Sequence, residues 1–371
     1  MSNQDAFLEL VRAGLWGKEV QLSTSDIIDF SAIYQLAQEQ SVTGLVAAGL
    51  EQVKDVIVPQ KSKLVFAGTA LQIEQHNREM NAFIAKLFGE LCQKDVSVLL
   101  LKGQGVAQCY ERPLWRTCGD VDLFLSDANY ASARQLLLPL ATDVEPEGAY
   151  SKHLGMTIDG WTVELHGTLR CGLSRRIDNN LDSIRDDVFY DNNVRLWQNG
   201  NTQVLLPSAN NDAIYIFTHI LNHFYKGGIG LRQICDWCRL LWIYRDSINQ
   251  DLLKERLCSM RLMSEWKAFG AFAVDYLGMP SEAMPIFDDN QNNNLKKKAK
   301  RIRNFVMEVG NFGHKRDMSY YNSKPYLVRK SISLGRRCGD LFRHAQIFPL
   351  DSMKFMPSII FNGLRSAAKG E

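Results

Sequence analysis

The chain has 371 residues, of which 46% are hydrophobic and 23% are charged, and its formal net charge is +2 at pH 7. These values are typical of a soluble globular protein with one large core or two to three domains. The near-neutral balance gives no chain-wide attraction to an acidic partner, so any affinity for nucleic acid would have to come from local patches.

The cysteines and the first residues indicate the compartment. The eight cysteines are scattered without the spacing of a disulfide framework, and the first residues include Asp5 and Glu9 rather than the apolar core of a signal peptide. No apolar run reaches the roughly 18 to 20 residues that a membrane helix needs. We therefore expect a cytoplasmic protein with free thiols and no transmembrane segment.

The first ninety-odd residues have helical patterns. Apolar residues recur at helical spacing, and short polar side chains at 23–26 offer N-caps for a helix that follows them. The apolar pattern over 61–94 is long for one helix, and Gly68 and Gly89 are the positions at which that helix would bend or end. The predicted helices cover 6–15, 27–38 and 61–94.

Two carboxylates then follow an apolar strand. This strand, predicted over 96–101, ends at Lys102-Gly103, and a second strand carries Asp120 and Asp122. Side chains alternate along a strand, so the two aspartates share one face and their apolar neighbours share the other. Carboxylates this close repel each other unless a cation lies between them, which makes the pair a candidate Mg²⁺ site. The alternative is a pair of aspartates in a solvated turn.

A third carboxylate lies on a later strand. The segments 152–158 and 161–169 alternate and are joined by Asp159-Gly160, a strong signal for a two-residue hairpin turn. Glu164 lies at the centre of the second segment, where burial disfavours it. If this strand lies beside the Asp-x-Asp strand, Glu164 completes a cluster able to hold two metals; otherwise it is a surface residue. His166 shares the face of Glu164, and His153 lies on the partner strand, so both could approach the same cleft. His166 is interpreted as a structural or a substrate residue, and His153 is expected to be structural or exposed. Helices are predicted over 104–110 and over 128–139, with Asp127 as the N-cap of the latter.

The chain after the core is predicted to be helical. One helix begins at Pro207-Ser208 and ends near Lys226, and the next covers 231–244. His219 and His223 share a face of the first helix, but no Glu follows His219, so the pattern is not that of a zinc protease. Two thiols on the second helix, Cys235 and Cys238, are expected to be buried. Beyond it, the residues 252–277 have an apolar helical period.

The last part of the chain is basic. A polar linker over 288–294 precedes a helix that starts with a run of lysines and arginines at 296–303. Further arginines follow as far as Arg343. Such a helix either has a solvated basic face or makes peripheral contact with an anionic membrane or a nucleic acid.

Several of these motifs together resemble a known family. Leu100-Leu101-Lys102-Gly103, then Tyr110, Pro113, Arg116 and Gly119, then Asp-Val-Asp and the later Val-Glu-Leu-His occur in the order seen in the uncharacterised nucleotidyltransferases of bacteria. This family is a distant branch of the DNA polymerase beta-like nucleotidyltransferase superfamily. The resemblance covers roughly residues 95–245.

The resemblance implies an α+β fold with a small mixed sheet, flanked by N-terminal and C-terminal helical regions. It implies that Asp120, Asp122 and Glu164 are catalytic metal ligands, and that Lys102-Gly103 replaces the Gly-Ser turn of the superfamily near the nucleotide phosphates. The remaining substrate-side residues that we infer are Arg116, His166, His223, Arg232 and Asp236. The alternative for Arg232 and Asp236, which lie one helical turn apart, is an ion pair on a solvated helix face. The predicted regions are 1–94, the nucleotidyltransferase-like core 95–206, a substrate-side helical part 207–290 and the basic part 291–371.

These inferences lead to one main function and two alternatives. The main expectation is transfer of a nucleoside monophosphate from a nucleoside triphosphate to an acceptor hydroxyl, with two Mg²⁺ or Mn²⁺ ions held by the carboxylates. The acceptor is a sugar, a small molecule, a protein or an RNA; polysaccharide biosynthesis is a hypothesis, because relatives often lie beside surface-polysaccharide genes. The alternatives are a metal-dependent sugar-nucleotide glycosyltransferase that uses Asp-x-Asp, and a binding protein that keeps an inactive transferase fold.

Overall fold

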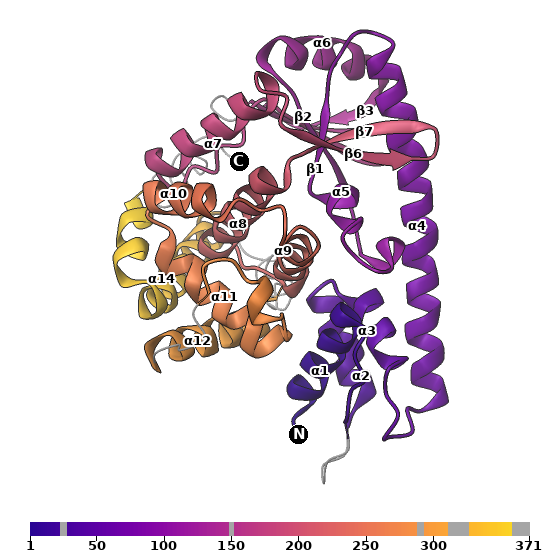
Figure 1. Cartoon of the computed structure of the whole chain (residues 1–371), viewed down its shortest axis with the longest axis vertical. Coiled ribbons are helices and arrows are strands. Elements are labelled where there is room, and N and C mark those ends of the chain that lie inside the picture. Colours follow the sequence, from indigo (N-terminus) through magenta and orange to yellow (C-terminus); the bar gives the residue numbers. More distant parts are fainter. Residues whose placement is uncertain (23–27, 148–151, 288–292, 311–325, 358–371) are drawn as a thin grey trace.

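A mixed β-sheet and the helices around it make up the fold, which Figure 1 shows for the whole chain. The computed structural model describes residues 1–22, 28–147, 152–287, 293–310 and 326–357. Within these residues the fold is α+β, as the sequence predicts.

Four helices precede the sheet. Two of them, α1 and α3, cross so closely that a methyl group at Gly14 would lie 2.0 Å from the carbonyl oxygen of Leu45. A second close approach runs from α3 to α1: a methyl group at Gly49 would lie 2.0 Å from the carbonyl oxygen of Leu10. Glycine is therefore required on both sides of this crossing. The four helices are α1 (Asn3–Trp16), α2 (Phe30–Glu39), α3 (Thr43–Leu50) and α4 (Gln60–Cys92).

The long helix α4 joins the N-terminal helices to the sheet. It has 33 residues and continues through Gly68 and Gly89 without a break. Its first part contributes Phe66 to the core of the N-terminal helices, whereas Met80 and Leu87 pack against the sheet. Figure 1 shows α4 running along both parts of the molecule.

The sheet has seven strands in the order β3-β4-β5-β2-β1-β7-β6. Two neighbouring pairs are parallel, β2 with β5 and β1 with β7, and the other pairs are antiparallel. The strands are β1 (Leu99–Leu101), β2 (Asp120–Phe124), β3 (Ala141–Val144), β4 (His153–Ile158), β5 (Trp161–His166), β6 (Val194–Asn199) and β7 (Thr202–Pro207).

The two faces of β2 differ, as the alternation predicts. Val121 and Leu123 are fully buried against α4 and α6 (Asp127–Leu137). Phe124 lies on the opposite face of β2 and packs in the apolar core that the helices on that side form. Its ring contacts that of Phe189, with ring centroids 4.9 Å apart. The aspartates share the face of Phe124, so they point away from α4.

The predicted hairpin is confirmed. Strands β4 and β5 pair antiparallel from Ile158↔Trp161 to His153↔His166. Asp159 and Gly160 both have positive φ, +51° and +82°, as a two-residue turn of this kind requires. This turn fixes the register of the strand that carries Glu164.

Helices after the sheet share one apolar core with the N-terminal helices. Trp237 and Trp266 lie at its centre with ring centroids 4.8 Å apart, and both thiols of the Cys-x-x-Cys sequence are buried in it, as predicted. The remaining helices are α5 (Gly103–Ala107), α7 (Arg175–Phe189), α8 (Ala209–Lys226), α9 (Leu231–Ile243), α10 (Gln250–Met260), α11 (Met263–Leu277), α12 (Asn293–Val309) and α14 (Tyr326–Ile347), with short 3₁₀ turns at Pro113–Trp115, Leu138–Leu140 and Ser281–Ala283.

Several predicted boundaries differ from the structure. The caps predicted at 23–26 lie outside the described residues; α2 begins at Phe30, where the Asp29 carboxylate accepts hydrogen bonds from two backbone N–H groups. Helix α6 is capped by Ser126, not by Asp127, because the Ser126 hydroxyl reaches the N–H of Asn129. The apolar period over 252–277 is divided into two helices at Arg261, whose backbone is left-handed.

The C-terminal region is only partly described. The predicted basic helix corresponds to α12, and the linker before it lies largely outside the described residues. None of the helices that the structure describes combines the length and the apolar character needed to cross a bilayer. Peripheral contact with a membrane or a nucleic acid stays a prediction.

Candidate active site

Strand pairing brings the three predicted carboxylates together. Strands β2 and β5 are parallel neighbours, and Asp122 lies directly opposite Glu164. Asp120 precedes Asp122 by two residues and so lies on the same face. The condition that the sequence left open, that the Glu164 strand lies beside the Asp-x-Asp strand, is met.

A cleft of about 460 Å³ lies over this face of the sheet, within the usual size range of ligand sites. Helices α8 and α9 form its opposite wall. Every site residue predicted from the sequence lines this cleft: Lys102, Gly103, Arg116, Asp120, Asp122, Glu164, His166, His223, Arg232 and Asp236. Their roles in binding or catalysis stay predictions.

Asp122 is the most buried of the three carboxylates, with 1% of its side chain exposed. Its Oδ2 lies 3.2 Å from Nζ of Lys102, and its Oδ1 lies 2.8 Å from Nε2 of His166. Burial opposes the charge of Lys102, but Asp122 and the neighbouring carboxylates outweigh burial and raise its pKa. Lys102 therefore stays charged at the end of β1.

The Asp120 carboxylate has no hydrogen-bond or ion-pair partner in the described part of the chain. The charge of Asp122, and then burial, raise the pKa of Asp120. A cation beside these two carboxylates would remove this repulsion, and oxygen atoms are the ligands that Mg²⁺ prefers. The donor set at Asp120 and Asp122 therefore fits a hard divalent cation.

Glu164 contacts two histidines. Its Oε2 lies 3.0 Å from Nε2 of His153 and 3.3 Å from Nε2 of His166. Burial opposes ionisation of Glu164, but these two contacts keep its pKa below its usual range. Burial likewise opposes the charge of His166, whereas Asp122 and Glu164 raise its pKa.

His153 also lines the cleft and was not among the predicted site residues, although the hairpin pattern allows it to approach the cleft. It lies across from His166 in the hairpin, with ring centroids 4.8 Å apart. The signal was present, since a two-residue turn at Asp159-Gly160 pairs 158 with 161 and therefore 153 with 166.

On the opposite wall, α8 carries two neutral histidines. Burial, and then the charge of Lys102, lower the pKa of both His219 and His223, the latter to about 4. Their Nε2 atoms lie 3.0 Å apart. Near neutral pH one ring therefore donates a hydrogen bond to the other.

Two arginines on this side differ in their partners. Nε and Nη2 of Arg116 donate to Asp236 at 3.0 and 2.6 Å, and the Tyr110 hydroxyl donates to the same carboxylate at 2.8 Å. Arg232 donates through Nη1 to the carbonyl of Thr117, but its Nε is buried without a partner in the described residues. Burial, and then the charge of Arg116, lower the pKa of Arg232. The Nε–H donor of Arg232 is therefore unsatisfied within the described residues.

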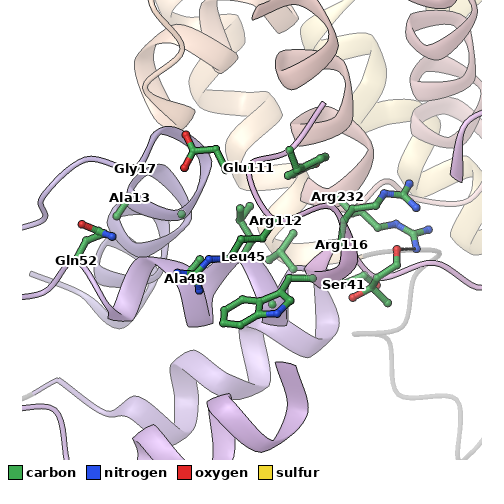
Figure 2. A pocket seen from close by; sticks show the side chains of 16 residues that line it. Ala13, Gly17, Ser41, Leu45, Ala48, Gln52, Glu111, Arg112, Arg116 and Arg232 are labelled. Atoms are coloured by element: carbon green, nitrogen blue, oxygen red, sulfur yellow. Dashed lines mark hydrogen bonds between the residues drawn. The ribbon is translucent and has the colours of Figure 1, made fainter. Parts of the chain in front are cut away.

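A second, smaller pocket lies behind these arginines. It has about 60 Å³ and lies between α1, α3 and the loop before β2, and Arg116 and Arg232 line both cavities. Figure 2 shows both arginines among its side chains, with Glu111 and Arg112 from the same loop. The pocket is too small to hold a nucleotide.

Comparison with known proteins gives one family match. Residues 26–277 match the family described as uncharacterised nucleotidyltransferase. Among solved structures, the chain is similar to an antigenic nucleotidyltransferase-like protein from Paracoccidioides brasiliensis, with 13% identity, a TM-score of 0.33, and coverage of 54% of this chain and 93% of that one. No curated protein matches the sequence significantly. Because the family match spans more than half of its length, this chain belongs to the uncharacterised nucleotidyltransferase family.

Proposed function

We propose that this chain transfers a nucleoside monophosphate from a nucleoside triphosphate to an acceptor hydroxyl. The observation that carries the proposal is the meeting of Asp120, Asp122 and Glu164 on one face of one cleft that Lys102 and Arg232 also line. Membership of the family supports the same reaction class. The proposed acceptor is a sugar, a small molecule, a protein or an RNA.

The carboxylates are proposed to hold Mg²⁺, with Mn²⁺ as the alternative. Bound there, the ions would offset charge on the phosphates and lower the pKa of the acceptor hydroxyl. Asp120 is the carboxylate with free ligand capacity, whereas both oxygens of Asp122 already have partners in the protein. Glu164 is the carboxylate proposed to accept the acceptor's proton, because 27% of its side chain is exposed to the cleft.

The basic residues are proposed to bind the triphosphate. Lys102 and Arg232 line the cleft with the carboxylates, and Arg232 has an unused donor. Gly103 follows Lys102 with φ of +42° and lines the cleft, where its backbone is proposed to lie near a phosphate. Arg116 and Asp236 hold each other and shape the wall, while His166 and neutral His223 are proposed to contact the substrate.

One observation favours the alternative of an inactive fold. Lys102 already offsets the charge of Asp122 at 3.2 Å, which weakens the demand for a cation on that side. An inactive scaffold would bind no nucleotide through a metal. The test of the proposal must therefore separate these two outcomes.

The experiment is calorimetric titration of the full chain with each of the four ribonucleoside triphosphates, with and without Mg²⁺. We expect binding that requires Mg²⁺ and that falls at least about tenfold in Asp120→Asn, which removes one ligand charge. The matched control is Asp246→Asn, at an aspartate that is 89% exposed, which should bind as the wild type does. Folded protein that binds none of the triphosphates contradicts the proposal. A parallel titration with UDP- and GDP-sugars tests the glycosyltransferase, which binding of these sugars alone would support.

A further inference from the structure

Three donor atoms converge on the hairpin side of the cleft. His153, Glu164 and His166 each bring one possible ligand atom to within 4.8 Å of those of the other two. The two contacts to Glu164 are 3.0 and 3.3 Å long. Ligand atoms held at about 2.0 to 2.2 Å from one tetrahedral ion lie roughly 3.3 Å apart, so both contacts to Glu164 suit a shared ion. The ligand atoms of the two histidines, which lie within 4.8 Å of each other, would move together on binding.

The backbone holds this arrangement rigidly. His153 and His166 are directly opposite each other on neighbouring antiparallel strands, and Glu164 lies two residues before His166 on the same face. Their positions follow from the register that the Asp159-Gly160 turn sets. Sites on strands keep ligand geometry better than sites on loops.

The group is accessible to an ion in solution. The exposed fractions of the side chains are 34% for His153, 27% for Glu164 and 14% for His166. All three line the cleft. Oδ1 of Asp122 lies 2.8 Å from Nε2 of His166, so a further oxygen donor is adjacent.

We infer that His153, Glu164 and His166 form a site for a first-row transition-metal dication. This site binds Zn²⁺, Co²⁺ and Mn²⁺ in preference to Mg²⁺. Imidazole nitrogen suits such ions, whereas Mg²⁺ requires oxygen ligands and sheds water reluctantly. The cleft thus has two different donor sets, one of oxygen at Asp120 and Asp122 and one of mixed nitrogen and oxygen at the β4–β5 hairpin. The inference deepens the proposed function and, for any catalytic meaning, rests on it, because Glu164 is both a member of this site and one of the proposed catalytic carboxylates.

The test uses the full chain and the metals alone, without nucleotide. Calorimetry with Co²⁺ and Zn²⁺ measures affinity and stoichiometry, and pulsed electron paramagnetic resonance of the Mn²⁺-loaded protein detects ¹⁴N coupled to the ion. We expect one tight Co²⁺ site per chain that a large excess of Mg²⁺ does not empty, and a nitrogen coupling from imidazole in the Mn²⁺ spectrum.

Two substitutions localise the site. His153→Gln should lower Co²⁺ affinity at least about tenfold and weaken the nitrogen coupling. The matched control is His76→Gln, at an exposed histidine on α4 that does not line the cleft. This variant should keep the wild-type Co²⁺ affinity and the wild-type nitrogen coupling. Mn²⁺ that binds without nitrogen coupling in the wild type overturns the inference, and so does a folded His153→Gln variant that binds Co²⁺ normally. In either case the two histidines only orient Glu164.

Failure here and failure of the proposed function give different results. Nitrogen coupling without any nucleotide binding leaves the metal site standing and removes the nucleotidyltransferase proposal. Mg²⁺-dependent nucleotide binding together with a Mn²⁺ spectrum that has no nitrogen coupling supports the nucleotidyltransferase proposal and removes the metal site at the hairpin.

Discussion

Arg116 and Asp236 form a buried ion pair in the wall of the cleft. Each side chain is 7% exposed, and two hydrogen bonds join the guanidinium to the carboxylate. A buried pair of this kind is costly to break on one side, because the remaining charge is left without a partner. We therefore assign the pair to the shape of the cleft rather than to chemistry.

This assignment predicts the effect of Asp236→Asn. The substitution leaves Arg116 buried and unmatched, so the free energy of unfolding should fall by about 3 kcal/mol. Tyr110→Phe removes one hydrogen bond to the same carboxylate and should cost only about 1 kcal/mol. Urea denaturation of the two variants and of the wild type measures both changes in the free energy of unfolding. Equal stability of Asp236→Asn and the wild type would show that the pair is not energetically coupled to folding.

Glu265 on α11 predicts a pH dependence of stability. Its side chain is fully buried, and burial, followed by the charge of Asp351, raises its pKa from 4.5 to about 8. Between these values the folded chain binds the proton and the unfolded chain does not, so stability is lost as the pH rises. The loss has an upper limit of about 1.4 kcal/mol per pH unit from this group.

The check is thermal unfolding at pH 5 and pH 8. Glu265→Gln cannot ionise, so its unfolding temperature should fall less between the two pH values than that of the wild type. Glu255→Gln, at an exposed glutamate on α10, should keep the wild-type fall. An unchanged pH response in Glu265→Gln contradicts the assignment.

At the scale of elements, the α1–α3 crossing depends on glycine. Gly14→Ala would place a methyl group 2.0 Å from the Leu45 carbonyl oxygen, so the helices must move apart, at a cost of about 1 to 3 kcal/mol. Gly68→Ala on α4 is the matched control: its methyl group meets nothing within 4 Å, and it should stabilise the protein by roughly 0.5 to 1 kcal/mol. Chemical denaturation of both variants should give opposite signs, and equal signs would refute the close-packing account.

Some elements could be predicted from the sequence because their signals are local. The Asp-Gly turn specifies the hairpin, and period-two alternation separates the aspartates from their apolar neighbours. Boundaries were less accurate where adjacent residues compete. Ser126 and Asp127 are both good caps, and only the backbone decides which one reaches the third N–H.

At the scale of the whole molecule, the site depends on contacts that no local pattern specifies. The parallel pairing of β2 with β5 could be stated only as a condition, since Asp122 and Glu164 are far apart in the sequence. The pairing of Arg116 with Asp236 joins residues 120 positions apart and was not predicted at all. His153 is intermediate, because its place follows from a turn that the sequence already indicates.

Transfer of labelled phosphorus would show whether this cleft moves a nucleotide from a triphosphate to an acceptor. The full chain is incubated with Mg²⁺, a cell extract that supplies acceptors, and triphosphates labelled with ³²P at either the α or the γ position. We predict that the α label alone becomes attached to an acceptor, with release of pyrophosphate, and that Asp120→Asn lowers this at least about a hundredfold. Attachment of the γ label, or equal attachment of the α label by Asp120→Asn, would contradict the account.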